Sequence, residues 1–146
     1  MNQHAAIAAL IALSGALAGL PVQAADPSPG KWEFSMETRV PAQPGFAPPP
    51  FQLSQCLSAA DAKDPSKVLG GIANPGATGC TYGDKSYSGN TFRFTMSCEG
   101  TFGIKSKGQV TFDANTIYGT IDAVAMVAGE KTELVNKISA RRLGAC

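Results

Sequence analysis

The residues best able to do chemistry in this sequence are its four cysteines, Cys56, Cys80, Cys98 and Cys146. Zinc ligands usually come as C-x₂₋₄-C pairs and redox motifs as C-x-x-C, and neither spacing occurs here. Cys146 is the last residue, whereas a prenylation box places its cysteine fourth from the end. An even number of cysteines in an exported chain is typical of disulfides. The spacing therefore predicts two disulfides and no metal site.

Four cysteines allow three pairings, and sequence alone does not choose among them. We favour Cys56–Cys80 together with Cys98–Cys146. The first bond would close a stretch rich in proline and glycine, which has little else to order it. The second would hold the C-terminal tail against a central strand.

Histidine chemistry is excluded if the N-terminal segment is removed, because His4 is the only histidine in the chain. Its loss excludes Ser-His-Asp and Cys-His catalysis and zinc bound by histidine. Two carboxylate pairs, Glu33/Glu37 and Asp61/Asp64, could supply an acid and a base. The first pair lies on the wet face of a predicted strand and the second near helix ends. We therefore expect no catalytic residues, no enzyme activity and no cofactor.

The N-terminus has the pattern of a cleaved signal peptide. An uncharged apolar run from Ala5 to Leu20 is followed by Pro21 and by the small residues of "VQA", which end at Ala24. The run is short for a membrane span. We predict a cleaved signal over 1–24, a single mature domain over 25–146, a periplasmic location and no transmembrane segment after cleavage.

The charge balance argues against nucleic acid as a partner. The chain has 12 Lys and Arg against 11 Asp and Glu, so the formal net charge is only +1. Proteins that bind nucleic acid or anionic membranes usually carry a clustered basic excess. We expect neither partner.

Strict alternation predicts antiparallel strands. "GKWEFSMETRV", "TFRFTMSC" and "TFGIKSKGQVTF" each place bulky apolar residues on one face and polar residues on the other, with Phe102 expected inside. Short turns at "SGN", "EG", "DANT" and "GE" connect successive strands. The proline-rich segment 41–51 reads as a loop, and Ser58 with Asp61 resembles a capping box. We predict a mainly β fold: a curved antiparallel sheet or partial up-and-down barrel, a β-meander with one or two short helices near 57–69.

The inward face of this sheet is the predicted ligand site. Curved sheets hold small apolar ligands against bulky linings, although the same residues could simply fill the core. Arg142 is expected on the apolar side, where it could bind a carboxylate or phosphate, and Arg141 in water, where it could pair with Glu33 or Glu37. The predicted ligand-binding residues are Trp32, Phe34, Met36, Phe92, Phe94, Met96 and Arg142.

The segments "PGKWEF", "QCLSAADAKDPSKVL", "FTMSCEG" and "RRLGAC" together carry a resemblance over nearly all of 29–146. The chain resembles the DUF3617 family of exported bacterial proteins, a domain of unknown function. The resemblance implies a periplasmic, mostly β domain and supplies no catalytic residues. The proline loop of such chains is often rich in methionine, which would suit a soft metal, but here it contains none.

We expect a protein that binds rather than catalyses. The leading hypothesis is a periplasmic module for a small hydrophobic or amphiphilic ligand. The alternative is an envelope protein-interaction module that uses a sheet edge or the proline-rich loop 41–51.

Overall fold

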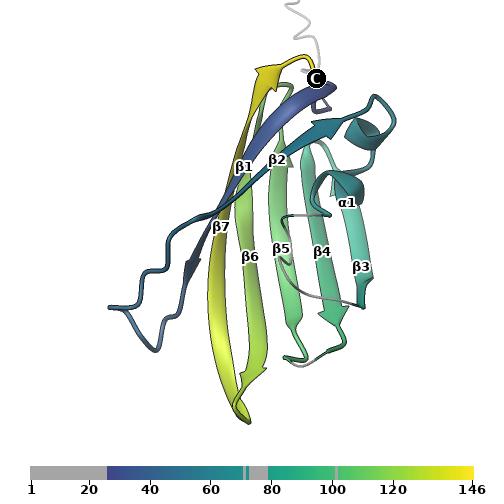
Figure 1. Ribbon diagram of the computed structural model, residues 1–146. Helices are drawn as coiled ribbons and strands as arrows, with labels where there is room; N and C mark the ends of the chain where they lie inside the picture. The colour runs from purple at the N-terminus through teal and green to yellow at the C-terminus, as the bar shows by residue number, and fades with distance from the viewer. Residues whose placement is uncertain (1–25, 71, 73–78, 101) are drawn as a thin grey trace, which may run out of the picture.

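The computed structural model describes residues 26–70, 72, 79–100 and 102–146, so the predicted signal peptide over 1–24 lies outside the described residues. The chain forms one seven-stranded antiparallel sheet in the order β2-β1-β7-β6-β5-β4-β3, and the sheet does not close into a barrel (Figure 1). This confirms the predicted fold class. The elements are β1 (Gly30–Arg39), β2 (Phe51–Leu57), a 3₁₀ turn (Asp61–Lys63), α1 (Pro65–Val68), β3 (Cys80–Ser88), β4 (Thr91–Cys98), β5 (Lys105–Phe112), β6 (Thr116–Val127) and β7 (Glu130–Gly144).

The strands β3 to β7 form the predicted meander, and β7 then returns to pair with β1. Ala140 of β7 lies opposite Phe34 on one side and opposite Ile117 on the other. The hairpin of β1 and β2 is thus joined to the meander through the first and last strands of the chain. This long-range pairing makes β1 and β7 neighbours, as the second and third strands from the β2 edge of the sheet.

Alternation gives the sheet two unlike faces. The inner face carries Trp32, Phe34 and Phe112, all fully buried, and the outer face carries the charged and hydroxyl side chains. The sequence of β6 left its orientation open; Ile117 and Ile121 point inward, whereas Tyr118 is 54% exposed on the outer face. Burying one face of every strand is the main source of stability in such a sheet.

The short helix α1 covers the inner face and bridges the two edges of the open sheet. The side-chain amide of Gln55 on β2 donates to the Val68 carbonyl at 2.9 Å, and the Tyr82 hydroxyl on β3 donates to the Ser66 carbonyl at 3.3 Å. Val68 of α1 and the residues Leu69 and Ile72 that follow it are buried in the core. In Figure 1, α1 lies over the sheet beside β4 and β3. The helix therefore completes the core that the open sheet leaves uncovered.

The prediction of one or two short helices near 57–69 is confirmed, as the 3₁₀ turn Asp61–Lys63 and the short helix α1. The Ser58 hydroxyl accepts from the Asp61 amide at 3.1 Å, as in a capping box, and donates to the Asp61 carboxylate at 2.8 Å. Asp64 then caps α1 by accepting the Ser66 amide at 3.1 Å. Among the described residues no helix is long and apolar enough to cross a membrane.

Two local predictions are wrong. Phe102 is 52% exposed, because β5 begins only at Lys105 and leaves Phe102 at the end of the sheet. The last turn is Ala128–Gly129 rather than "GE", since Val127 pairs with Glu130. Both turn residues have positive φ, 51° and 82°, which matches the right-handed twist of a two-residue hairpin.

The predicted disulfide pairing is also wrong, although two disulfides are present. The bonds are Cys56–Cys146 and Cys80–Cys98. Cys80 lies directly opposite Cys98 on the neighbouring strands β3 and β4. Cys56 pairs with Lys31 on β1, and Lys31 also pairs with Gly144 of β7, so the tail crosses β1 to reach β2. Strand order, which cysteine spacing does not reveal, decides the pairing.

Candidate functional site

The structure brings together the six apolar residues predicted to bind a ligand, but within the core. Trp32 and Phe34 are fully enclosed, and the most exposed of the others is 6% exposed. The rings of Phe92 and Phe94 stack with their centroids 5.2 Å apart, and Tyr82 meets Phe94 edge-on at 5.4 Å. Burial raises the pKa of Tyr82, and the nearby Asp64 carboxylate adds to this effect. Sequence reasoning missed Tyr82, because its place depends on the β3–β4 register.

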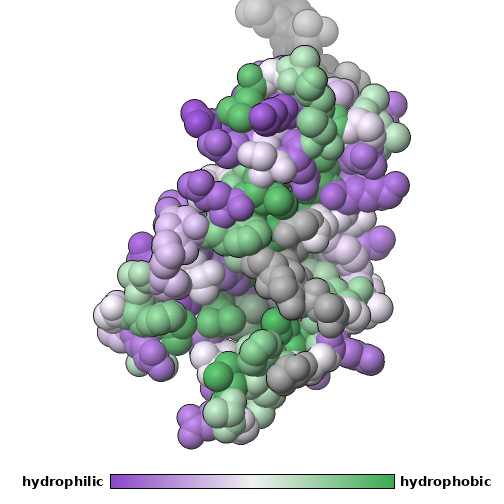
Figure 2. Space-filling view, in the orientation of Figure 1, coloured by the Kyte–Doolittle hydropathy of each residue, from purple (hydrophilic) through white to green (hydrophobic). Residues whose placement is uncertain are grey.

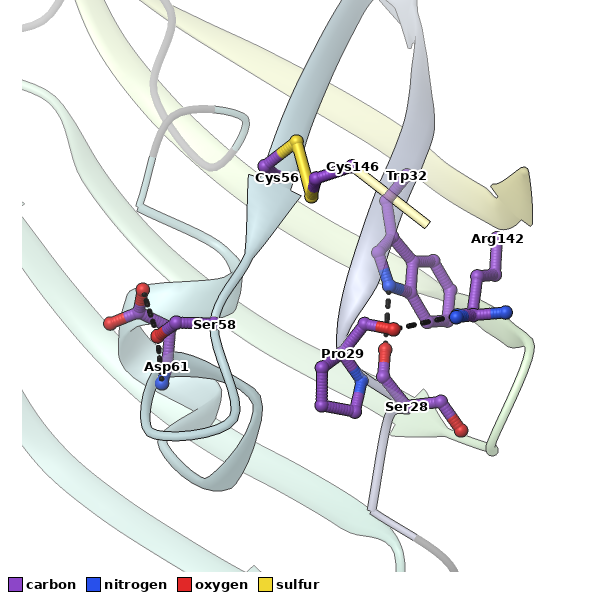
Figure 3. The surroundings of a disulfide bond; sticks show 8 residues. All are labelled: Ser28, Pro29, Trp32, Cys56, Ser58, Asp61, Arg142 and Cys146. Atoms are coloured by element: carbon purple, nitrogen blue, oxygen red, sulfur yellow. Dashed lines mark hydrogen bonds between the residues drawn. A yellow bond between two sulfur atoms is a disulfide. The ribbon is translucent and has the colours of Figure 1, made fainter. Parts of the chain in front are cut away.

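Arg142 and Trp32 hold the segment that leads into β1. The Arg142 Nε donates to the Pro29 carbonyl at 2.8 Å, and the Trp32 indole donates to the Ser28 carbonyl at 2.9 Å (Figure 3). The two residues are partners in the β1–β7 register, as alternation predicts. The guanidinium thus lies on the apolar side of β7, where it is engaged by backbone. Figure 3 also shows the Cys56–Cys146 bond at the same end of the sheet.

The carboxylates considered for acid–base chemistry have structural partners. Glu33 accepts from Arg141 at 2.9 Å on the outer face, which is the ion pair expected for Arg141. Asp61 belongs to the capping box and lies 3.8 Å from Lys67. The Ser66 hydroxyl and the neighbouring amides hold the pKa of Asp64 below its ordinary value by donating to its carboxylate. These contacts account for three of the four carboxylates without any substrate.

An open groove of about 840 Å³ lies on the outer face of the sheet. It runs across the strands from β3 to β7, and we call it the outer groove. Lys105 and Lys107 on β5 lie near its middle, and Val124 on β6 and Val135 on β7 contribute apolar surface toward the β7 end. The remaining outward side chains of its lining are Thr81, Thr95, Ser97, Asp122 and Glu133.

Two smaller depressions extend the outer groove along the same face. One of about 620 Å³ shares Thr95, Lys107 and Asp122 with it. The other, of about 520 Å³, shares Val135 and reaches Glu37 and Arg39 on β1. Together they make one hollowed surface that reaches from β3 to β1.

A β-bulge in β3 shapes one end of this surface. The register of β3 against β4 shifts between Tyr82 and Lys85, and the Asp84 amide donates to the Thr95 hydroxyl at 2.9 Å. A side chain at Gly83 would come within 2.7 Å of that hydroxyl oxygen, so the position needs a residue without one. The absence of a side chain here leaves the end of the outer groove open.

The charges of the outer groove form no ion pair within 4 Å in the described residues, although opposite charges stand on neighbouring strands. Lys107 lies opposite Asp122 and Lys105 opposite Val124 in the β5–β6 register. Within the described part of the chain, neither lysine forms an ion pair. Asp122 and Glu133 stand on β6 and β7, so positive charge gathers on the β5 side of the apolar surface.

Sequence reasoning assigned these outward residues to an ordinary solvated face. Alternation does identify Lys105, Lys107 and Val124 as outward, but a hollow depends on twist, on the bulge and on which strands are neighbours. The apolar residues Val124 and Val135 on an otherwise polar face were the signal that could have pointed to it.

Comparison with known proteins adds the family and nothing about a ligand. The chain matches a family described as a protein of unknown function (DUF3617) over residues 27–146. Neither the curated proteins nor the solved structures gave a match. Because the match covers most of the chain and includes every described strand, the chain belongs to the DUF3617 family.

Proposed function

We propose that this protein is a periplasmic, non-catalytic binding module for a small hydrophobic or amphiphilic molecule, and that the outer groove is its binding site. One observation carries the proposal: an open groove of about 840 Å³ that combines apolar side chains with unpaired lysines within the described residues. A hollow of this size with a few polar groups is the usual setting for a small ligand.

The arrangement of the outer groove favours an anionic amphiphile. An apolar chain would lie along Val124 and Val135, and a carboxylate or phosphate would lie between Lys105 and Lys107. Charge-assisted hydrogen bonds to such lysines are stronger than neutral ones.

The periplasmic part of the proposal is supported by the cysteines. All four are in disulfides, and the described residues include no free cysteine. Disulfides persist in oxidising compartments and are rare in the cytosol. The predicted signal over 1–24 agrees with export.

The non-catalytic part is supported by the occupied carboxylates. Glu33, Asp61 and Asp64 hold strand and helix ends rather than a cleft. None of the three lines the outer groove.

A second candidate is an envelope protein-interaction module, because the open sheet leaves two strand edges and a projecting loop. The strands β2 and β3 are the edges, and the loop 41–50 lies outside the sheet, with Phe46 53% exposed. In Figure 2, apolar residues reach the surface on the side where Figure 1 shows this loop.

Native mass spectrometry of protein purified from its own periplasm is the first test. Extra mass that disappears on denaturation would identify a bound small molecule and its size. A clean protein mass from several preparations, together with no binding of added dodecanoate, would contradict the proposal.

A pair of matched variants locates the site. Replacing Lys105 and Lys107 with alanine should weaken dodecanoate binding by about tenfold or more, because two charge-assisted contacts are lost. Replacing Lys31 and Lys131, two exposed strand lysines outside the outer groove, is the control and should leave affinity unchanged. Equal losses in both variants would mean that only overall charge matters.

A further inference from the structure

We infer that β2 is the docking edge of this protein and takes an extended, uncharged segment of a partner protein as an added strand. The inference deepens the second candidate function by naming the edge and the partner's chemistry. It does not depend on the outer groove. Strand addition uses the unpaired N–H and C=O groups of an edge for affinity and the alternating side chains for specificity.

The first observation is a long gap in the charge pattern. No Asp, Glu, Lys or Arg occurs between Arg39 and Asp61, although the chain has 23 charged residues in all. This gap contains the whole loop 41–50 and the whole of β2. Interface cores are depleted in charged residues and enriched in aromatic ones. Two exposed aromatics, Phe46 and Phe51, lie within the gap.

The two edges of the sheet differ in how they are protected. Edge strands usually avoid unwanted pairing with charges, prolines or bulges. β3 has such devices: a bulge between Tyr82 and Lys85, with Asp84 and Lys85 both exposed. β2 has none of them, since all seven of its residues pair with β1 in continuous register. The unprotected edge is therefore β2.

The docking edge is also held in place before any partner arrives. Cys56 is bonded to Cys146, the Gln55 side chain donates to the Val68 carbonyl, and Leu57 is buried. An edge fixed in its bound conformation lowers the entropy cost of association. These contacts lie at the C-terminal end of β2, so the free part is Phe51–Ser54, about 13 Å long.

The geometry of β2 sets the chemistry of the partner. Phe51 and Leu53 are on the inner-face side, whereas Gln52 and Ser54 point outward and are exposed. An added strand would align its apolar side chains with Phe51 and Leu53. The three prolines 48–50 have no N–H to donate, so pairing begins at Phe51. Because α1 contacts β2 at Gln55, a short free segment fits this edge better than the sheet of a second copy.

The test uses ¹⁵N-labelled protein purified from the periplasm and a blocked eight-residue peptide of alternating valine and threonine. The peptide should shift the amide resonances of Phe51–Ser54 and slow their hydrogen exchange. A peptide with the same side chains but N-methylated at every residue should bind at least about tenfold more weakly, because it has no N–H to donate.

A matched pair of aromatic variants separates the two edges. Phe51 on β2 is 39% exposed and Tyr87 on β3 is 40% exposed. Phe51→Ala should weaken peptide binding about fivefold or more, and Tyr87→Ala should leave it unchanged.

Four results would overturn the inference: no shift in Phe51–Ser54 at about 1 mM peptide, the weakest affinity expected of a short added strand; equal binding of the N-methylated peptide; shifts at β3 instead of β2; or a dimer of this chain that buries β2. None of these results bears on the outer groove, whose test is the lysine pair.

Discussion

The inner and outer faces of the sheet are made by the same seven strands, yet they differ in packing and in charge. The inner face is closed by α1 and filled by rings, with Trp32, Phe34 and Phe112 fully buried. The outer face is hollowed and carries unpaired lysines within the described residues. Neighbouring residues of one strand therefore differ in environment, because one side chain packs in the core and the next faces solvent. Inner positions fill the core, and outer positions are those at which we propose that a ligand binds.

The two disulfides differ in the length of chain that they close. Cys80–Cys98, of which only Cys98 is buried, joins neighbouring strands of one hairpin. Cys56–Cys146, of which both cysteines are exposed, joins segments 90 residues apart.

The largest effect is expected from the exposed disulfide. Replacing Cys56 and Cys146 with serine should cost about 4–5 kcal/mol in the free energy of unfolding, because the bond closes the longer loop. Replacing Cys80 and Cys98, which close a loop of 18 residues, should cost about 3 kcal/mol. Urea unfolding of both double variants checks the order. A larger loss for the Cys80/Cys98 variant would contradict the loop-length argument.

The next effect compares two aromatic residues on opposite faces. Phe112→Ala should cost about 3–5 kcal/mol, because it leaves a cavity in the filled core. Tyr118→Ala on the outer face should change stability by less than about 1 kcal/mol, since its ring is 54% exposed. The same unfolding experiment measures both, and similar losses would mean that the two faces are not distinct in packing.

A single added methyl group should sharpen the comparison. The Cβ of Gly108→Ala would lie 2.3 Å from the Phe94 ring on the inner face, so the ring or the strand must move. We expect a loss of about 1–3 kcal/mol. Gly45→Ala in the exposed loop meets no atom within 4 Å and should leave thermal stability unchanged or slightly raised. A neutral Gly108→Ala would show that the core near β5 is loosely filled.

The smallest expected effect is on the pH dependence of the free energy of unfolding. It arises at α1, the helix that covers the inner face. Hydrogen bonds from Ser66 lower the pKa of Asp64 below its ordinary 3.8, so the charged form stabilises the fold above that value. This contribution, below about 1 kcal/mol, is lost as the pH falls through the lowered pKa. Asp64→Asn keeps a helix cap but should flatten this acid limb in unfolding measured between about pH 5 and 2. An unchanged limb would remove Asp64 from the acid response.

The sequence by itself determined which side of each strand would be buried. Period-two alternation in β1, β4 and β5 is read directly from side-chain polarity, and it placed Trp32, Phe34, Met36, Phe92, Phe94 and Met96 inside correctly. The Ser58–Asp61 cap was equally readable, because it depends on residues three apart. Even cysteines and the family segments indicated two disulfides and a DUF3617 domain.

Only the tertiary structure decided which strands are neighbours, and the remaining findings follow from that. The disulfide pairing depends on β7 lying beside β1, a contact between the first and last strands of the sheet in chain order. The outer groove needs five strands and a bulge in register, and the docking edge needs β2 to have no second partner in the described sheet. Alternation indicates the face on which a side chain lies, but it does not indicate which residue of the neighbouring strand lies opposite. Strand order cannot be read from one strand, because it depends on how all seven strands bury their apolar faces together.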